Sequence, residues 1–359
     1  MPESSDRKKV MADLRTTAFD PEFSPGARSA VRTCLGLRPD ERITIITDRE
    51  TLAIAASLVA EVDRIGAEAG VFVLEDAAAR PLSGMPAEIL EDLALSRVSI
   101  FAAQAQEGEL RSRMQIFDLV HRHRIRHGHM VNISDRIMRE GMRADFAAVD
   151  RLSAAVFARA TSASRLRATT PAGSDLEADL SPALRWVKTS GIISEDTWGN
   201  LPGGEIFTAP ANVNGTFVAD GVVGDYLCRR YGDLREYPVT VEIEKSRIRS
   251  VYCRNKTLQD DFLDYTRKDA NSNRVGEIAI GTNVAVRNII GEILQDEKYP
   301  GVHIAFGHPA GEHTGADWSS TTHIDLVGRD FSVWLDGDRI MTDGVFADPY
   351  LAAALGDSS

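Results

Sequence analysis

The first 165 residues alternate between strand-like and helix-like patterns of apolar side chains. Residues 42–47 form a short β-branched run, and residues 52–65 then place apolar side chains at helical spacing. Residues 70–74 form a second apolar run, so these segments predict a strand–helix–strand unit of the kind that builds parallel sheets. Further elements expected here are a strand at 98–102, a helix at 110–123, a strand at 130–133 and a helical connector over 135–165. Residues 1–165 should therefore form an α/β, Rossmann-like N-terminal domain with a parallel sheet.

The pattern changes after residue 165, where a turn at 171–175 precedes many short strand-like runs. The expected strands cover residues 238–243, 248–253, 277–280, 302–306, 323–326 and 331–335. Helical spacing predicts two helices among them, over 257–268 and from near Asn283 to Asp296. Residues 166–359 should thus form a β-rich, mixed α+β domain, and a chain of 359 residues is long enough for two domains.

Charge and composition narrow the possible partners. The net charge of −12 disfavours nucleic acid and anionic membranes, because both require a basic surface. The charged N-terminus is not followed by an apolar signal segment, and no apolar run approaches the roughly 20 residues that span a bilayer. The three cysteines are widely separated and suit free thiols in a reducing compartment. A cytoplasmic protein without nucleic-acid or membrane partners is expected.

A dinucleotide cofactor is not expected. The loop after the first predicted strand is Asp48-Arg49-Glu50, without the glycines that let a backbone approach a pyrophosphate.

The histidines fall in two clusters, and the first is surrounded by arginine. It spans His121 to His129 and includes Arg122, Arg124 and Arg126. Neighbouring cations disfavour metal binding, so one interpretation is a solvated basic helix end, where positive charge complements the helix dipole. The alternative is an anion-binding patch that faces the second domain, with His129 at the end of a strand.

The second cluster contains His303, His308, His313 and His323 and favours metal binding. Alternate residues of a strand point the same way, so His323 and Asp325 should share one face. An imidazole beside a carboxylate suits zinc, iron, cobalt or manganese, although a simple His–Asp hydrogen bond at a strand edge is the alternative. The polar, glycine-containing segment 309–320 has the character of an active-site loop.

Two glutamates extend this candidate site. Glu205 and Glu277 each stand at the beginning of an apolar strand-like run. A carboxylate at the edge of such a strand is costly to bury unless it is paired or bound to a cation, although either residue alone would suit a surface position. Together with the histidines and Asp325, the two glutamates suggest a pair of metals that share a bridging carboxylate or water.

Several of these segments resemble the M29 family of metallo-aminopeptidases. The resemblance rests on the segments at residues 203–210, 276–283, 296–307 and 322–327, with a weaker match near 171, and it covers about residues 166–345. It implies two divalent metals, most simply zinc, cobalt or manganese. The residues implied as ligands are Glu205, Glu277, His303, His323 and Asp325.

The chain departs from the M29 pattern at one position. That family places a catalytic tyrosine seven residues after the histidine that matches His303, and this chain has Ala310 there. His308 and His313 are the candidate catalytic residues for proton transfer or oxyanion stabilisation in its place. The same fold is shared by 2,5-dihydroxypyridine 5,6-dioxygenases, which use one Fe(II). The resemblance to that group implies histidine at the positions where this chain keeps Glu205 and Glu277.

Three hypotheses follow for the function. The first is a metallohydrolase in which a metal-activated water attacks an amide bond of a small or aromatic substrate or a short peptide. The second is a mononuclear Fe(II) ring-cleaving dioxygenase that uses His303 or Glu277 with His323 and Asp325. The third is a non-catalytic metal-binding protein. The M29 resemblance further implies a homodimer.

Overall fold

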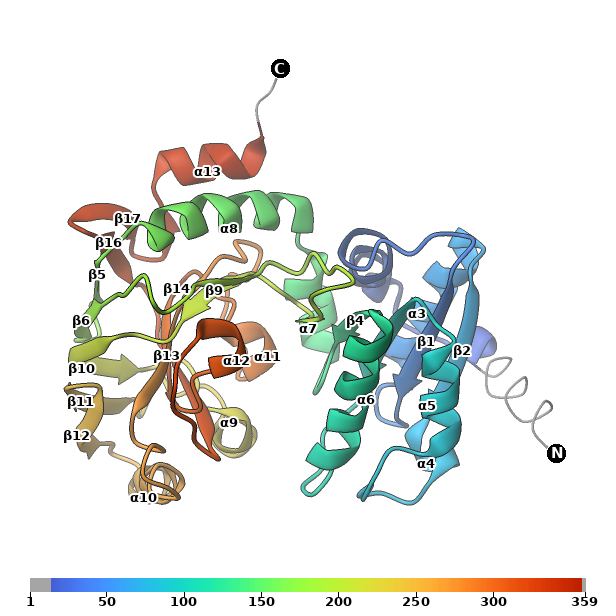
Figure 1. Ribbon diagram of the computed structural model, residues 1–359, viewed down its shortest axis with the longest axis horizontal. Coiled ribbons are helices and arrows are strands. Elements are labelled where there is room, and N and C mark those ends of the chain that lie inside the picture. The colour runs from blue at the N-terminus through green and yellow to red at the C-terminus, as the bar shows by residue number, and fades with distance from the viewer. Residues whose placement is uncertain (1–13, 357–359) are drawn as a thin grey trace. The chain divides into compact units, whose positions relative to one another are not determined.

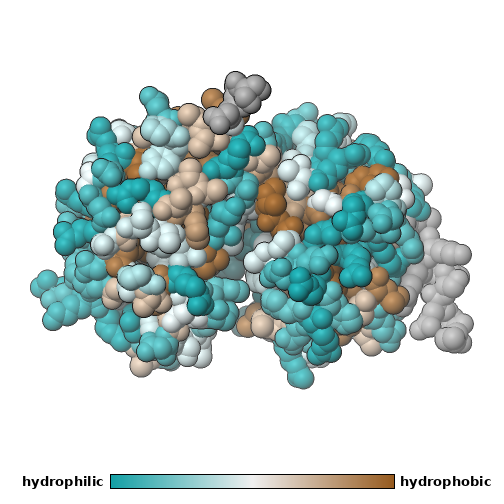
Figure 2. All heavy atoms as spheres, turned by 45° about the horizontal axis from the view of Figure 1, so that its top comes forward, coloured by the Kyte–Doolittle hydropathy of each residue, from teal (hydrophilic) through white to brown (hydrophobic). Residues whose placement is uncertain are grey.

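The computed structural model describes residues 14–356 (Figure 1). Within these residues, no helix combines the length and apolar character needed to cross a bilayer. The charged N-terminal segment lies mostly outside the described residues. Hydrophilic side chains cover much of the face seen in Figure 2. The chain divides into two compact units, one comprising residues up to Phe146 with Gly191–Gly203, the other comprising Ala147–Ser190 and the chain from Gly204 onward.

Unit 1 is built on a parallel five-stranded sheet of order β2-β1-β3-β4-β8. Its strands are β1 (Arg42–Thr47), β2 (Glu68–Val73), β3 (Val98–Ala102), β4 (Arg126–His129) and β8 (Gly199–Asn200). Its α-helices are α2 (Ser24–Arg28), α3 (Leu52–Ile65), α4 (Leu74–Ala77), α5 (Ala87–Ala94), α6 (Leu110–His123) and α7 (Asp135–Arg139). The apolar sides of α5 and α6 pack against Ile46, Phe72 and Phe101 of the sheet. The expected strand–helix–strand unit and parallel sheet are confirmed.

The strand expected at 130–133 is wrong, and the fourth strand is β4 instead. Its side chains are polar, so an apolar run does not mark it, yet all four residues are buried. Arg126 is compensated by an ion pair with Glu41. The following apolar run cannot extend the strand because Asn132 takes a left-handed backbone conformation, with φ 60°.

Unit 2 contains two antiparallel sheets. The eight-stranded sheet has the order β12-β11-β10-β6-β5-β16-β17-β18, and the five-stranded sheet has the order β15-β14-β13-β9-β7. The strands are β5 (Arg165–Thr169), β6 (Asp175–Asp179), β7 (Val187–Thr189), β9 (Glu205–Thr208), β10 (Asn212–Ala219), β11 (Val239–Glu244), β12 (Arg247–Tyr252), β13 (Val275–Gly281), β14 (Gly301–Gly307), β15 (His323–Val327), β16 (Ser332–Leu335), β17 (Asp338–Thr342) and β18 (Val345–Phe346). The helices are α8 (Phe146–Thr161), α9 (Asp225–Tyr231), α10 (Lys256–Tyr265), α11 (Ile293–Asp296), α12 (Gly311–Thr314) and α13 (Asp348–Leu355).

The two sheets of unit 2 share one apolar core. Phe217 and Val241 of the larger sheet and Ile278, Ile304 and Leu326 of the smaller sheet belong to the same buried cluster. Helix α8 contributes Leu152, Val156 and Ala160 to this core. Unit 2 therefore begins at Ala147, within α8. The expected domain limit at residue 165 lies just beyond that helix. One face of the five-stranded sheet therefore packs into the apolar core. The opposite face does not contribute these side chains to the core, and it can carry polar residues.

The helix expected from Asn283 to Asp296 is wrong, because only its last four residues form α11. The preceding segment is irregular, and Gly291 has a positive φ of 79°. The buried Asp296 carboxylate accepts hydrogen bonds from the backbone N–H groups of Ile290, Gly291 and Glu292. A side chain thus satisfies donors that a helix would have used internally.

Candidate metal centre

The predicted ligands lie on one face of the five-stranded sheet. In the register of β13, β14 and β15, Glu277 stands opposite Ala305, and Ala305 stands opposite Asp325. His303 faces Ala279 and His323 faces Gly307 in the same register. Directly opposed residues share a face, and so do alternate residues of one strand, so these four ligands project together. Glu205 of β9 joins them from its position opposite Gly281.

Small residues separate the ligands on this face. On β13 and β14, the residues on the same face as the ligands, either two positions along the strand or directly opposite on the next strand, are Ala279, Gly281, Gly301, Ala305 and Gly307. The intervening apolar side chains, such as Ile278 and Ile304, point into the core. This division of polar and apolar positions explains how an apolar strand can carry a metal ligand.

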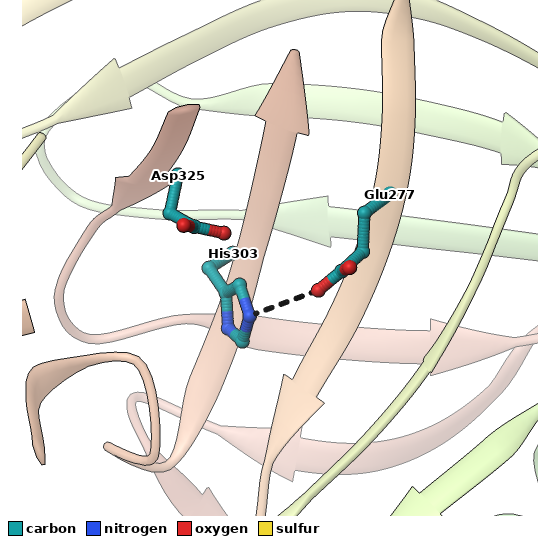
Figure 3. A group of neighbouring side chains, drawn as sticks. All are labelled: Glu277, His303 and Asp325. Atoms are coloured by element: carbon teal, nitrogen blue, oxygen red, sulfur yellow. Dashed lines mark ion pairs between the residues drawn. The ribbon is translucent and has the colours of Figure 1, made fainter. Parts of the chain in front are cut away.

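Three side chains form the tightest group (Figure 3). The ligand atoms of Glu277, His303 and Asp325 all lie within 4.8 Å of one another. The Nε2 atom of His303 is 3.5 Å from Oε2 of Glu205 and also 3.5 Å from Oε1 of Glu277. It is buried and makes no hydrogen bond.

A buried nitrogen facing two carboxylates without a hydrogen bond suggests that a cation belongs there. The lone pair of a neutral imidazole would repel both carboxylates, whereas a metal ion between them would satisfy all three groups. Burial acts to lower the pKa of His303, but Glu277, Glu205 and Asp325 outweigh it and raise that pKa. The negative charge around this ring attracts any cation, including a proton.

His323 is oriented for the same purpose. Its Nδ1 atom lies 3.0 Å from the backbone oxygen of His308, which can only accept a hydrogen bond, so Nδ1 carries the hydrogen. The Nε2 atom is thereby directed to Asp325, whose Oδ1 lies 3.3 Å away. Burial acts to lower the pKa of His323, but Asp325 outweighs it and raises that pKa to about 10. Anchoring a ligand histidine through its second nitrogen is typical of metal sites.

Glu205 lies beside His303, but one of its carboxylate oxygens is already hydrogen-bonded to Lys298 and Thr189. Its Oε1 atom accepts hydrogen bonds from Nζ of Lys298 at 2.6 Å and from Oγ1 of Thr189 at 3.0 Å. Lys298 also lies 2.6 Å from Oε1 of Glu297. Burial acts to lower the pKa of Lys298, but Glu205 and Glu297 raise it, so the ammonium is charged.

The segment that leads into β15 is tied down by Asp269. Its carboxylate accepts hydrogen bonds from the backbone N–H and the hydroxyl of Thr321 and from the hydroxyl of Ser320. The hydroxyl of Tyr265 donates to the backbone oxygen of His323 at 3.2 Å. These contacts fix the chain immediately before the His323–Asp325 pair.

The two candidate catalytic histidines differ in position. His308 is half-buried and its Nδ1 accepts a hydrogen bond from the N–H of Ala310 at 3.1 Å, so a neutral ring carries its hydrogen on Nε2. His313 is exposed on α12, and its Nε2 lies 3.8 Å from Glu312. In the described part of the chain, neither ring is paired with a predicted ligand, and their catalytic roles stay a prediction. Ala310 itself has a left-handed conformation, with φ 48°.

Three residues of the site, Lys298, Glu297 and Asp269, are not marked by the pattern of the sequence. The signal for the first two is an adjacent Glu-Lys pair that stands just before the strand of His303. Such a pair is ordinarily taken as surface charge, and only burial reveals its role.

The first histidine cluster belongs to unit 1 and has two parts. His121 and His123 are exposed in the last turn of α6, as expected for a solvated basic helix end. That interpretation is wrong for His127 and His129, which are buried in β4. Ser99 hydrogen-bonds Nδ1 of His127 at 2.8 Å, and Phe101 stacks on His129 with ring centroids 5.1 Å apart. Burial lowers the pKa of His127 to about 3 and the pKa of His129 also falls well below its usual value, so both rings are neutral.

Fold and site together define a protein of mixed α/β architecture, of a type known among enzymes, with a group of side chains that could hold a metal ion. The chain belongs to the 2,5-dihydroxypyridine 5,6-dioxygenase family, whose model matches residues 27–348. Members of this family are metal-dependent. A search of curated protein sequences gives no match.

Two solved structures share the fold. One is 2,5-dihydroxypyridine dioxygenase from Pseudomonas putida KT2440, with a TM-score of 0.64 and 16% identity over 95% of this chain and 99% of that chain. The other is wild-type AmpT from Thermus thermophilus, an M29 aminopeptidase, with a TM-score of 0.67 and 18% identity over 92% of this chain and 100% of that chain. The resemblance to both groups is thus supported as a likeness of fold, and the hydrolase interpretation is not favoured over the dioxygenase.

Proposed function

We propose that this protein is an Fe(II)-dependent dioxygenase that opens the ring of a small dihydroxylated aromatic or heteroaromatic substrate. The observation that carries the proposal is the group formed by Glu277, His303 and Asp325, with an unsatisfied Nε2 at its centre, in a chain of the dihydroxypyridine dioxygenase family. Imidazole and carboxylate ligands are the set that non-haem Fe(II) oxygenases use.

The ligand residues have distinct tasks. His303 and His323 would each offer the lone pair of Nε2, the latter held by its hydrogen bond to His308. Asp325 and Glu277 would supply negative charge that compensates the cation. A bound Fe(II) would provide the redox chemistry that activates dioxygen and the Lewis acidity that lowers the pKa of a ring hydroxyl. His308, if neutral, presents an N–H at Nε2 that can hold a substrate oxygen.

A metallohydrolase of the M29 type is the second candidate. The observation in its favour is that all five ligands implied by that resemblance share one face of the sheet. Against it, the methyl group of Ala310 cannot replace a tyrosine phenol as a proton donor.

Oxygen consumption separates the candidates. Protein purified anaerobically and loaded with Fe(II) is expected to consume dioxygen with dihydroxypyridines or related diols and to leave aminoacyl anilides intact. Amide hydrolysis with zinc or cobalt and no oxygen uptake would establish the hydrolase instead. Bound metal without turnover of either substrate class would support the non-catalytic hypothesis. The His323→Ala variant is the control, because it should lose activity in either enzyme.

A further inference from the structure

Lys298 is a buried cation inside the candidate metal centre. Its side chain is 1% exposed, and Nζ lies 2.6 Å from Oε1 of Glu205 and 2.6 Å from Oε1 of Glu297. Burying an ammonium is costly unless it is paired, and these two carboxylates pair it. The backbone on either side is also fixed, since the Lys298 N–H donates to Gln295 and its carbonyl accepts from Asn283.

The contacts of Lys298 use up one of the two oxygens of Glu205. Oε1 receives the ammonium and the hydroxyl of Thr189. A carboxylate that bridges two metals must give one oxygen to each, and Glu205 retains only Oε2, which lies 3.5 Å from Nε2 of His303. Glu205 can therefore contribute to a metal at His303 but not to a second metal on its other side.

We propose that Lys298 takes the place of a second metal ion and thereby limits this centre to one divalent cation. The inference rests on the proposed function in so far as it assumes a metal at His303, and it explains how a chain that keeps both glutamates can still be mononuclear. Lys298 is a positioning residue, since it acts through Glu205.

The charge of the buried cluster agrees with this assignment. The cluster holds four carboxylates, from Glu205, Glu277, Glu297 and Asp325, and the ammonium of Lys298, which contacts Glu205 and Glu297. With one divalent ion the cluster has a net charge of −1 when Glu297 is ionised and of zero when Glu297 is protonated. A second divalent ion would leave excess positive charge and would place a dication beside the ammonium, which is strongly unfavourable in a site of low dielectric constant.

Metal stoichiometry tests the proposal without reference to turnover. The wild-type chain, dialysed against excess Co(II) or Zn(II), is expected to retain one ion per chain by elemental analysis. Lys298→Met is expected to retain two, and its melting temperature should rise with excess metal more than that of the wild type. Lys188→Met is the control, because Lys188 is a partly exposed lysine of the same sheet, paired with Asp150, and should remain at one.

The variant leaves two buried carboxylates unpaired, so a second variant guards against misfolding. Lys298→Met combined with Glu297→Gln removes one charge of each sign and should fold and bind two ions. A wild-type stoichiometry of two or of zero overturns the inference, and so does a folded Lys298 variant that still binds one. One ion per chain without oxygenase activity would leave the inference standing and reject the proposed function.

Discussion

The ring Nδ1 of His323 donates a hydrogen bond to the backbone oxygen of His308, 3.0 Å away. The bond links the two ends of the segment between β14 and β15 and sets which nitrogen of His323 is free for a cation. The hydrogen bond therefore fixes the orientation of His323, a predicted ligand, without the help of a metal.

Replacement of His323 should therefore weaken metal binding. His323→Ala removes the Nε2 atom that lies 3.3 Å from Oδ1 of Asp325 and is expected to weaken metal affinity by about 10- to 100-fold. Isothermal titration with Co(II) measures the loss. His313→Ala is the matched control, because His313 is exposed on the same segment and should bind metal normally. Unchanged affinity in His323→Ala would place the metal elsewhere, whereas lost activity with intact metal in His313→Ala would confirm a catalytic role for that histidine.

Metal removal should destabilise unit 2. Glu205 and Glu277 both face Nε2 of His303, and a cation between them would reduce the repulsion between the carboxylates and the nitrogen lone pair. Removal of the metal by a chelator is therefore expected to lower the melting temperature. At a metal concentration about 100 times the dissociation constant, binding adds about 2.7 kcal/mol of stability. Calorimetry with and without chelator measures this difference. In Glu277→Gln the difference should shrink, and an undiminished metal effect there would argue against Glu277 as a ligand.

Asp269 should hold the segment before β15 in place. Its four donors, among them the N–H and hydroxyl of Thr321, keep the pKa of this carboxyl well below its usual value. Asp269→Asn is expected to speed amide exchange across residues 309–322 and to weaken metal binding, while the fold as a whole persists. Hydrogen-exchange mass spectrometry checks the first effect. Asp264→Asn is the control, because Asp264 is an acidic residue of the nearby helix α10. Equal amide exchange in both variants would contradict the role of Asp269 as the anchor of this segment.

The buried histidines of unit 1 should make its stability fall in acid. In the folded state the pKa of His127 is about 3 and that of His129 is also lowered, whereas an unfolded histidine titrates near 6.5. Below pH 6.5 the unfolded state binds more protons, so each histidine can remove up to about 1.4 kcal/mol per pH unit until its folded pKa is reached. Amide exchange of β3 and β4 at pH 7.5, 6 and 5 measures the trend.

His127→Phe should flatten this acid dependence, because it removes one of the two groups that must take up a proton. His121→Phe is the control, since His121 is exposed at the end of α6. A slope that is identical in wild type and His127→Phe would contradict the assignment.

The sequence predicts best where side-chain pattern and burial agree. Strand β1 and helix α6 coincide with the expected ranges because apolar side chains there mark the buried positions. The five candidate ligands could be selected because carboxylates and imidazoles are unusual in apolar strands.

The sequence predicts poorly where buried residues are polar or where apolar residues do not form regular structure. Strand β4 is buried but polar, and the segment before α11 is apolar but irregular, because the Asp296 carboxylate replaces helical hydrogen bonds. Lys298 could not be predicted as a residue of the site, because lysine is usually exposed and its sequence context does not show that it is buried. The predicted homodimer and cytoplasmic location stay predictions.

The small residues of β13 and β14 have a consequence for redesign. Glu277-x-Ala279-x-Gly281 and His303-x-Ala305-x-Gly307 have the same spacing, and because the strands run antiparallel, each ligand faces the alanine of its neighbour. A Cβ on Gly281 would lie 2.0 Å from the backbone oxygen of Tyr299, and one on Gly307 would lie 2.1 Å from that of Thr322. The two glycines should thus resist substitution in any library, whereas Ala279 and Ala305 are the positions at which new donor groups could be introduced to change which metal the protein selects.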